Sequence, residues 1–150
     1  MILWDRSPYP AEDRARAIRL ADASFGPVAA PGYPVARQGD ALHVGRKIAH
    51  DHTAVAWAQW SRVSGLSIQA PAEVSFPHTH LCLQAAAAGM GVAVVERRLA
   101  GADLAAGRLT AVAEFASFPD GFAALPHRTR PLSPQATAFL DWLAAELGAS

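Results

Sequence analysis

Residues 81–95, LCLQAAAAGMGVAVV, decide the fold class of this chain. The alanine-rich first part is a strong helix former, and Gly89 is the usual kind of residue to follow a helix C-terminus. Gly91 to Val95 is then a continuous apolar run, which is typical of a strand buried on both faces of a parallel sheet. A helix that leads directly into such a strand predicts an α/β fold.

Further helices are predicted on both sides of this stretch. Upstream, four apolar side chains at helical spacing predict a helix from about residue 54 to residue 64, with Thr53 as its cap and Gly65 at its end. Trp57 and Trp60 of that helix are best explained as core packing. Downstream, Ser133 and Pro134 are a typical N-cap and first residue of a helix with one apolar stripe. The stripe contains Ala136, Phe139, Leu140, Leu143 and Leu147.

The remaining segments give shorter predicted elements. Leu81, Ala85 and Ala88 are expected to lie on one face of a helix that Pro77, His78 and Thr79 open. Strands are expected at residues 2–4, 23–30, 42–45, 72–76, 109–115 and 122–125, with a bulge or bend at Gly26–Pro27. A polar loop is expected at 47–53, a short helix at 99–106 and a turn at 118–121. Strands that alternate with helices favour a largely parallel sheet.

Composition limits the functions to consider. A chain of 150 residues, 51% hydrophobic and 17% charged, fits one globular domain. Thirteen basic residues balance thirteen acidic ones, so we expect no direct DNA binding by this chain. Arg14, Arg16 and Arg19 lie beside acidic residues and are interpreted as a solvated face. The apolar runs are too short to cross a bilayer and no signal peptide is evident, so we expect a cytoplasmic protein that does not bind membranes.

The residues give little support for a catalytic site, a metal site or a cofactor site. The pairs His50/His52 and His78/His80 lie in a predicted loop and at a helix start, where side chains two apart do not share a face, so we predict no metal site. Cys82 lies in an apolar helix and is interpreted as a buried thiol, and Ser75 has no glycine elbow. Gly89-Met90-Gly91 follows a helix and precedes a strand, the reverse of a phosphate-binding loop. We therefore expect no enzyme and no cofactor.

From Asp51 onward the chain resembles the effector-binding domain of LysR-type bacterial transcriptional regulators. The features that carry the resemblance are Trp57-Ala-Gln-Trp60 followed by Gly65-Leu66, then Phe76, Leu83 to Val94, Leu104 to Leu109 and Phe139 to Leu143. Their order and spacing over about a hundred residues make the match fairly specific. The resemblance implies a Rossmann-like subdomain of a type 2 periplasmic-binding-protein-like fold. Residues 24–116 would be subdomain II, and residues 1–19 and 118–150 would be remnants of subdomain I.

The resemblance also implies a function. The chain would be a small-molecule effector-sensing domain without its DNA-binding part, with amino acids and small carboxylates as the effector classes to test. The alternative is an interaction or dimerisation module, derived from that domain, that has no ligand. A homodimer is expected because most of subdomain I, which would cover the C-terminal apolar stripe, has no counterpart.

The expected effector site lies at two places. At residues 75–79 a strand leads into a helix N-terminus, where free N–H groups and the helix dipole favour an anion. Similar regulators bind effectors there and just after the first crossing strand, so the implied site residues are Ala30, Pro31, Phe76, Pro77, His78 and Thr79. The alternative, in which Thr79 only caps the helix and Phe76 belongs to the core, stays open.

Overall fold

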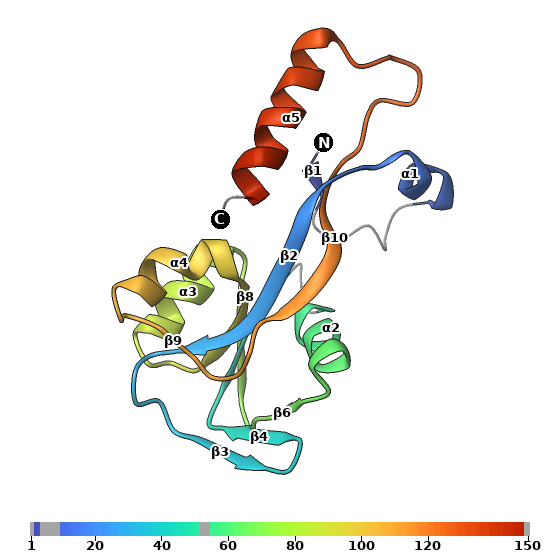
Figure 1. The fold of residues 1–150 in the computed structure, drawn as a ribbon. Helices are drawn as coiled ribbons and strands as arrows, with labels where there is room; N and C mark the ends of the chain where they lie inside the picture. Colours follow the sequence, from blue (N-terminus) through green and yellow to red (C-terminus); the bar gives the residue numbers. More distant parts are fainter. Residues whose placement is uncertain (1, 4–9, 52–54, 149–150) are drawn as a thin grey trace. The chain divides into compact units, whose positions relative to one another are not determined.

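The structure is a computed structural model that describes residues 2–3, 10–51 and 55–148 (Figure 1). Its contacts divide the chain into two compact units. The larger unit is Ser24–Ala116, and the smaller unit combines the residues up to Ala23 with those from Ser117 onward. None of the described helices is long and apolar enough to cross a membrane.

A mixed sheet forms the centre of the larger unit (Figure 1). Its middle strand β8 pairs antiparallel with β2 on one side and parallel with β5 on the other, and β5 pairs parallel with β7. The short strand β9 also pairs with β2. The strands are β2 (Ile18–Ala29), β5 (Lys47–His50), β7 (Glu73–Phe76), β8 (Val92–Glu96) and β9 (Thr110–Ala111). The continuous apolar run after Gly91 is therefore a central buried strand, as predicted.

Each parallel strand is followed by a helix, which is the α/β pattern that the sequence predicts. The helices are α2 (Val55–Ser64) after β5, α3 (Thr79–Ala87) after β7 and α4 (Arg97–Ala105) after β8. A second, small sheet lies beside them, in which β4 pairs antiparallel with β3 and parallel with β6. Its strands are β3 (Val35–Gln38), β4 (Ala41–Val44) and β6 (Ser67–Gln69).

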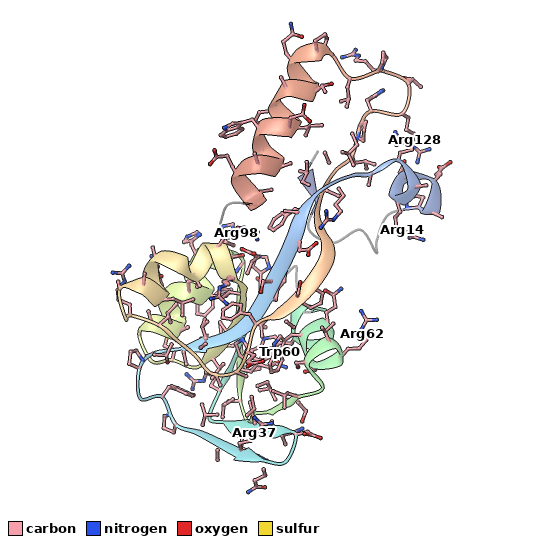
Figure 2. All side chains as sticks on the ribbon, in the orientation of Figure 1. Arg14, Arg37, Trp60, Arg62, Arg98 and Arg128 are labelled. Carbon is pink, nitrogen blue, oxygen red and sulfur yellow. The ribbon has the colours of Figure 1, made fainter. Side chains whose placement is uncertain are left out.

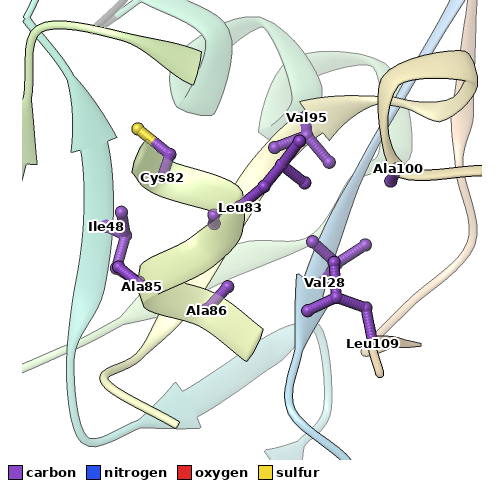
Figure 3. Packing of buried hydrophobic residues seen from close by; sticks show 10 residues of the cluster. Val28, Ile48, Cys82, Leu83, Ala85, Ala86, Val95, Ala100 and Leu109 are labelled. Atoms are coloured by element: carbon purple, nitrogen blue, oxygen red, sulfur yellow. The ribbon is translucent and has the colours of Figure 1, made fainter. Parts of the chain in front are cut away.

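Both faces of the main sheet are covered. On one face α3 and α4 pack on alternate side chains of β2, β5 and β8, including Val28, Ile48 and Val95, as Figure 3 shows. On the other face Trp57 of α2 packs with Val92 and the next residue of β2, Ala29. The two indole rings of α2 are buried and meet edge to face, with 6.4 Å between the centroids of Trp57 and Trp60. The prediction that these tryptophans belong to the core is confirmed.

The smaller unit contains fewer elements. β1 (Ile2–Leu3) pairs antiparallel with the end of β10 (Ala116–Ala124), with Ile2 opposite Ala124. The helices are α1 (Ala11–Arg16) and α5 (Pro134–Gly148). Ser133 caps α5 as predicted, since its Oγ accepts a hydrogen bond of 3.2 Å from the N–H of Ala136.

Several predictions of secondary structure are wrong, all for the same physical reason. The polar loop expected at residues 47–53 contains β5, whose buried Ile48 and Ala49 make up too short an apolar run to stand out between polar neighbours. The turn expected at 118–121 lies inside the continuous strand β10. No bulge occurs at Gly26–Pro27, because the pairing of β2 with β8 keeps its register there. The strands β3 and β6 were not predicted. In each place tertiary pairing outweighs local residue preference.

Candidate functional site

The carboxyl ends of the parallel strands meet at one edge of the larger unit's sheet. His50 of β5 lies opposite Phe76 of β7, and β5 and β8 run in the same direction. Pro77 and His78 continue from β7 into α3 at this edge. In open α/β sheets this is the edge at which ligands bind.

Phe76 to Thr79 form a short connection fixed at both ends. The half-buried ring of Phe76 packs against the core cluster, and its carbonyl accepts a hydrogen bond of 3.0 Å from the N–H of Asp51. At the other end the carbonyl of His78 accepts bonds from the N–H groups of Leu81 and Cys82. The connection is therefore held in place by the backbone, while Pro77 and His78 are exposed.

The start of α3 has no side-chain cap among the described residues. His78 is the N-cap residue, with extended backbone (φ −138°, ψ 138°), and its side chain makes no capping bond. Thr79 is the first helical residue, so the alternative in which Thr79 caps the helix is wrong. The first-turn N–H groups of Thr79 and His80 therefore find no capping side chain among the described residues.

The neighbouring helix α4 differs in this respect. Glu96 precedes it, and the carboxylate accepts a bond of 2.7 Å from the N–H of Arg98 and one of 2.8 Å from the guanidinium Nη1 of the same residue. The side chain of Glu96 is buried. The position of a carboxylate directly before a predicted helix could have shown this cap from the sequence. Among the described residues, the chain thus supplies an anion at the start of α4 and none at the start of α3.

The other candidate groups at this edge take part in no visible catalytic or metal-binding arrangement. The rings of His78 and His80 stack, with 5.5 Å between their centroids. The described residues contain no cluster of three or more His, Cys, Asp or Glu side chains placed to hold a metal. Burial raises the pKa of the Cys82 thiol, with a smaller contribution from the charge of Asp51, and its Sγ donates to the carbonyl of Ala49. A thiol in that state is a poor nucleophile. His52 and Thr53 lie outside the described residues.

Ala30 and Pro31 lie at the opposite edge of the sheet. They follow the end of β2, which runs antiparallel to β8, so that Val28 lies opposite Ala93 whereas Phe25 lies opposite Glu96. At about 3.3 Å per residue, the length of β8 separates the two edges by more than 10 Å. The structure therefore brings Phe76, Pro77, His78 and Thr79 together but does not bring Ala30 and Pro31 to them.

Comparison with known proteins agrees with this architecture. The family model described as the LysR substrate binding domain matches residues 3–148. The curated relative "HTH-type transcriptional regulator TrpI" of Pseudomonas aeruginosa is 32% identical over 98% of this chain and 51% of its own length, so the chain spans about half of that relative.

Solved structures show the same fold. The effector domain of the transcriptional regulator AmpR of Pseudomonas aeruginosa is 19% identical, with a TM-score of 0.64 over 89% of this chain and 65% of that one. The regulatory domain of CcmR from Synechocystis, solved in complex with 2-PG, is 19% identical, with a TM-score of 0.57 over 87% of this chain and 66% of that one. The predicted type 2 periplasmic-binding-protein-like fold is thereby confirmed. The chain belongs to the LysR substrate-binding-domain family.

Proposed function

We propose that this chain is a small-molecule effector-sensing domain that holds the anionic group of its effector against the start of α3. The observation that carries the proposal is the start of α3, which no described side chain caps, at the ligand-binding edge of the sheet. It lies beside helix α4, whose N-terminus is already filled by Glu96. Family membership supports effector sensing in general, and the CcmR domain in complex with 2-PG shows that this fold takes a small ligand.

The proposed site consists of Phe76, Pro77, His78 and Thr79. Phe76 supplies an apolar wall, and the N–H groups that follow supply donors to a carboxylate. The exposed rings of His78 and His80 stack beside these donors. Ala30 and Pro31 are left out, because the register of β2 puts them at the other edge. The larger unit is proposed as subdomain II, and the smaller unit as remnants of subdomain I.

The site binds and does not catalyse in this proposal. DNA binding is not assigned to these residues, because the match to the substrate-binding domain occupies residues 3–148. A cytoplasmic location belongs to the same proposal.

Placing a cap on α3 tests the site. His78→Asp adds a carboxylate at the N-cap position, which competes with an anionic effector and stabilises the helix by about 1 kcal/mol. In a thermal-shift screen of amino acids and small carboxylates, the wild-type chain should gain melting temperature with at least one compound. His78→Asp should melt higher without ligand and lose that gain.

His43→Asp is the matched control, since it replaces another exposed histidine on β4, in the other sheet. It should keep the ligand-induced gain. An equal gain in wild type and His78→Asp would show that the effector does not use the start of α3.

We also propose that the chain pairs with a second copy through α5. No described residue of this helix is fully buried, and Phe139 and Trp142 are 52% and 56% exposed with their rings in contact. An apolar helix face of this kind is rarely left in water by a soluble protein. A dimerisation module that binds no ligand would pair in the same way. The effector screen therefore decides between an effector-sensing domain and a module that only dimerises.

A further inference from the structure

A groove on the larger unit lies apart from the edge described above. Its volume is about 770 Å³, within the range of small-molecule sites. The C-terminal end of α2, the hairpin β3–β4 and residues 112–116 form its walls. The larger apolar side chains of its lining are Val35, Leu42, Val63, Leu66, Val112 and Phe115.

The groove and the start of α3 are different places. α2 begins just after β5, at the carboxyl edge of the sheet, and the groove is lined by Val63 and Ser64 at the opposite end of the helix. Ten helical residues span about 15 Å. The inference below is therefore independent of the proposed effector site.

Arg37 is a cation on an otherwise apolar face of the hairpin. Side chains alternate along β3, so Arg37 shares a face with Val35, and its cross-strand partner is the buried Leu42. Arg37, labelled in Figure 2, is one of the residues that line the groove, and its Nε–H donates to the carbonyl of Gly39 at 3.0 Å. Its Nη groups bond to no acceptor among the described residues.

Glu114 brings the opposite charge to the same groove from another segment. Its carbonyl accepts a bond of 3.3 Å from Nε1 of the buried Trp60, so its backbone is held against α2. Its carboxylate is exposed and forms no hydrogen bond or ion pair within the described part of the chain. The groove therefore has one cation, one anion and an apolar floor. The cation and the anion come from separate segments of the chain.

We infer that this groove binds a small zwitterion with an apolar side group. Arg37 would hold the carboxylate through its Nη groups, Glu114 would hold the ammonium, and the apolar group would cover Val35 and Val63, which are 37% and 47% exposed. Free apolar amino acids and short apolar peptides share this chemistry, and they differ in the separation of their two charges.

Calorimetric titration of the whole chain tests this inference. The probes are L-phenylalanine, the dipeptide Leu-Phe, 3-phenylpropionate and 2-phenylethylamine. A zwitterion should bind at least about tenfold more tightly than the two singly charged analogues, because each of them leaves one charged side chain unpaired. Tighter binding of phenylalanine identifies a free amino acid as the ligand, and tighter binding of Leu-Phe identifies a peptide.

Variants separate this groove from other sites. Arg37→Gln and Glu114→Gln should each weaken zwitterion binding about tenfold, whereas Arg62→Gln, an exposed arginine on α2 outside the lining, should leave it unchanged. Equal affinities for all four probes, no binding at about 10 mM, or binding that Arg37→Gln and Glu114→Gln both leave unchanged would overturn the inference. Zwitterion binding that disappears in His78→Asp would move the ligand to α3 and overturn it as well.

Discussion

At the scale of single residues, close contacts explain why particular side chains stand where they do. A Cβ added to Gly26 would lie 2.6 Å from Cγ of Phe115, so the ring occupies the space that any side chain at this position would need. Gly26 was expected to mark a bulge because glycine weakens a strand. Glycine occupies this position of a regular strand because the ring of Phe115 crosses over it. The local sequence does not reveal that contact.

Gly26→Ala is therefore expected to destabilise the fold by about 1–3 kcal/mol, because it overpacks a buried contact. Gly101→Ala is the control: it lies in α4, where an added Cβ meets nothing within 4 Å. That change should stabilise the chain by about 0.5–1 kcal/mol through helix propensity. Urea unfolding of both variants measures the difference, and equal effects would contradict the close contact.

Asp13 shows how charged residues near the chain start are organised. The cluster around it was interpreted as a solvated face, yet Asp13 is only 7% exposed. Its carboxylate accepts hydrogen bonds from Arg16 at 2.6 Å and from Arg128 at 2.8 Å. These hydrogen bonds, that from Arg16 first, hold the pKa of Asp13 below its ordinary value of 3.8. The contact with Arg128, 115 positions away in the sequence, could not be foreseen from spacing along the chain.

The lowered pKa fixes the sign of an acid-stability prediction. Asp13 stabilises the fold at pH values above the ordinary carboxyl pKa, and this contribution is lost as pH falls through the lowered pKa. Asp13→Asn should therefore be less stable than wild type at about pH 6, and the difference should shrink toward about pH 3. Urea midpoints at a series of pH values give the comparison. A difference that stays constant with pH would contradict the ion-paired arrangement.

At the scale of elements, the two helices that follow β7 and β8 differ at their N-termini. Glu96 is buried and caps α4, whereas the side chain of His78 makes no capping bond to α3. The sequence predicted both helices, but it placed the cap of α3 one residue too late and missed that of α4. Caps depend on the backbone conformation of one residue, which periodicity does not define.

Glu96→Ala should consequently cost about 1–3 kcal/mol, because it removes a cap and a buried partner of Arg98. Thr79→Ala should change stability by less than about 0.5 kcal/mol, since Thr79 is not the cap. Thermal or urea unfolding of the two variants checks the ranking. A larger loss in Thr79→Ala than in Glu96→Ala would restore Thr79 as the cap.

The helices and strands also differ in how well a sequence pattern can predict them. Elements with a strong local signal, such as β8 and the capped helix α5, were predicted correctly. Short strands such as β5 and β3 were missed, because a strand of four residues becomes recognisable only through its partners in the sheet. The candidate site residues come together only in part for the same reason. Phe76 to Thr79 are contiguous, whereas the distance from them to Ala30 depends on an antiparallel register that no local pattern specifies.

At the scale of the whole molecule, α5 provides a test of pairing. Leu143→Glu puts a charge on its apolar stripe, and Gln135→Glu puts the same charge on an exposed polar position of the same helix. If two copies pair through the stripe, Leu143→Glu should sediment as a folded monomer and Gln135→Glu as a dimer. Sedimentation at micromolar concentration and circular dichroism measure assembly and folding separately. A wild-type chain that stays at 15.8 kDa at every concentration would exclude the dimer.

The central claim, that this chain senses a small anionic effector at the start of α3, is tested most directly by amide chemical-shift mapping. ¹⁵N-labelled protein would be titrated with the compound that raises the melting temperature most. The account predicts saturable shifts concentrated at the N–H groups of Asp51, Phe76, His78, Thr79 and His80, with the largest changes at Thr79 and His80, and none of comparable size at Ala30. Saturable shifts confined to other residues, or no shifts with any amino acid or small carboxylate, would contradict it.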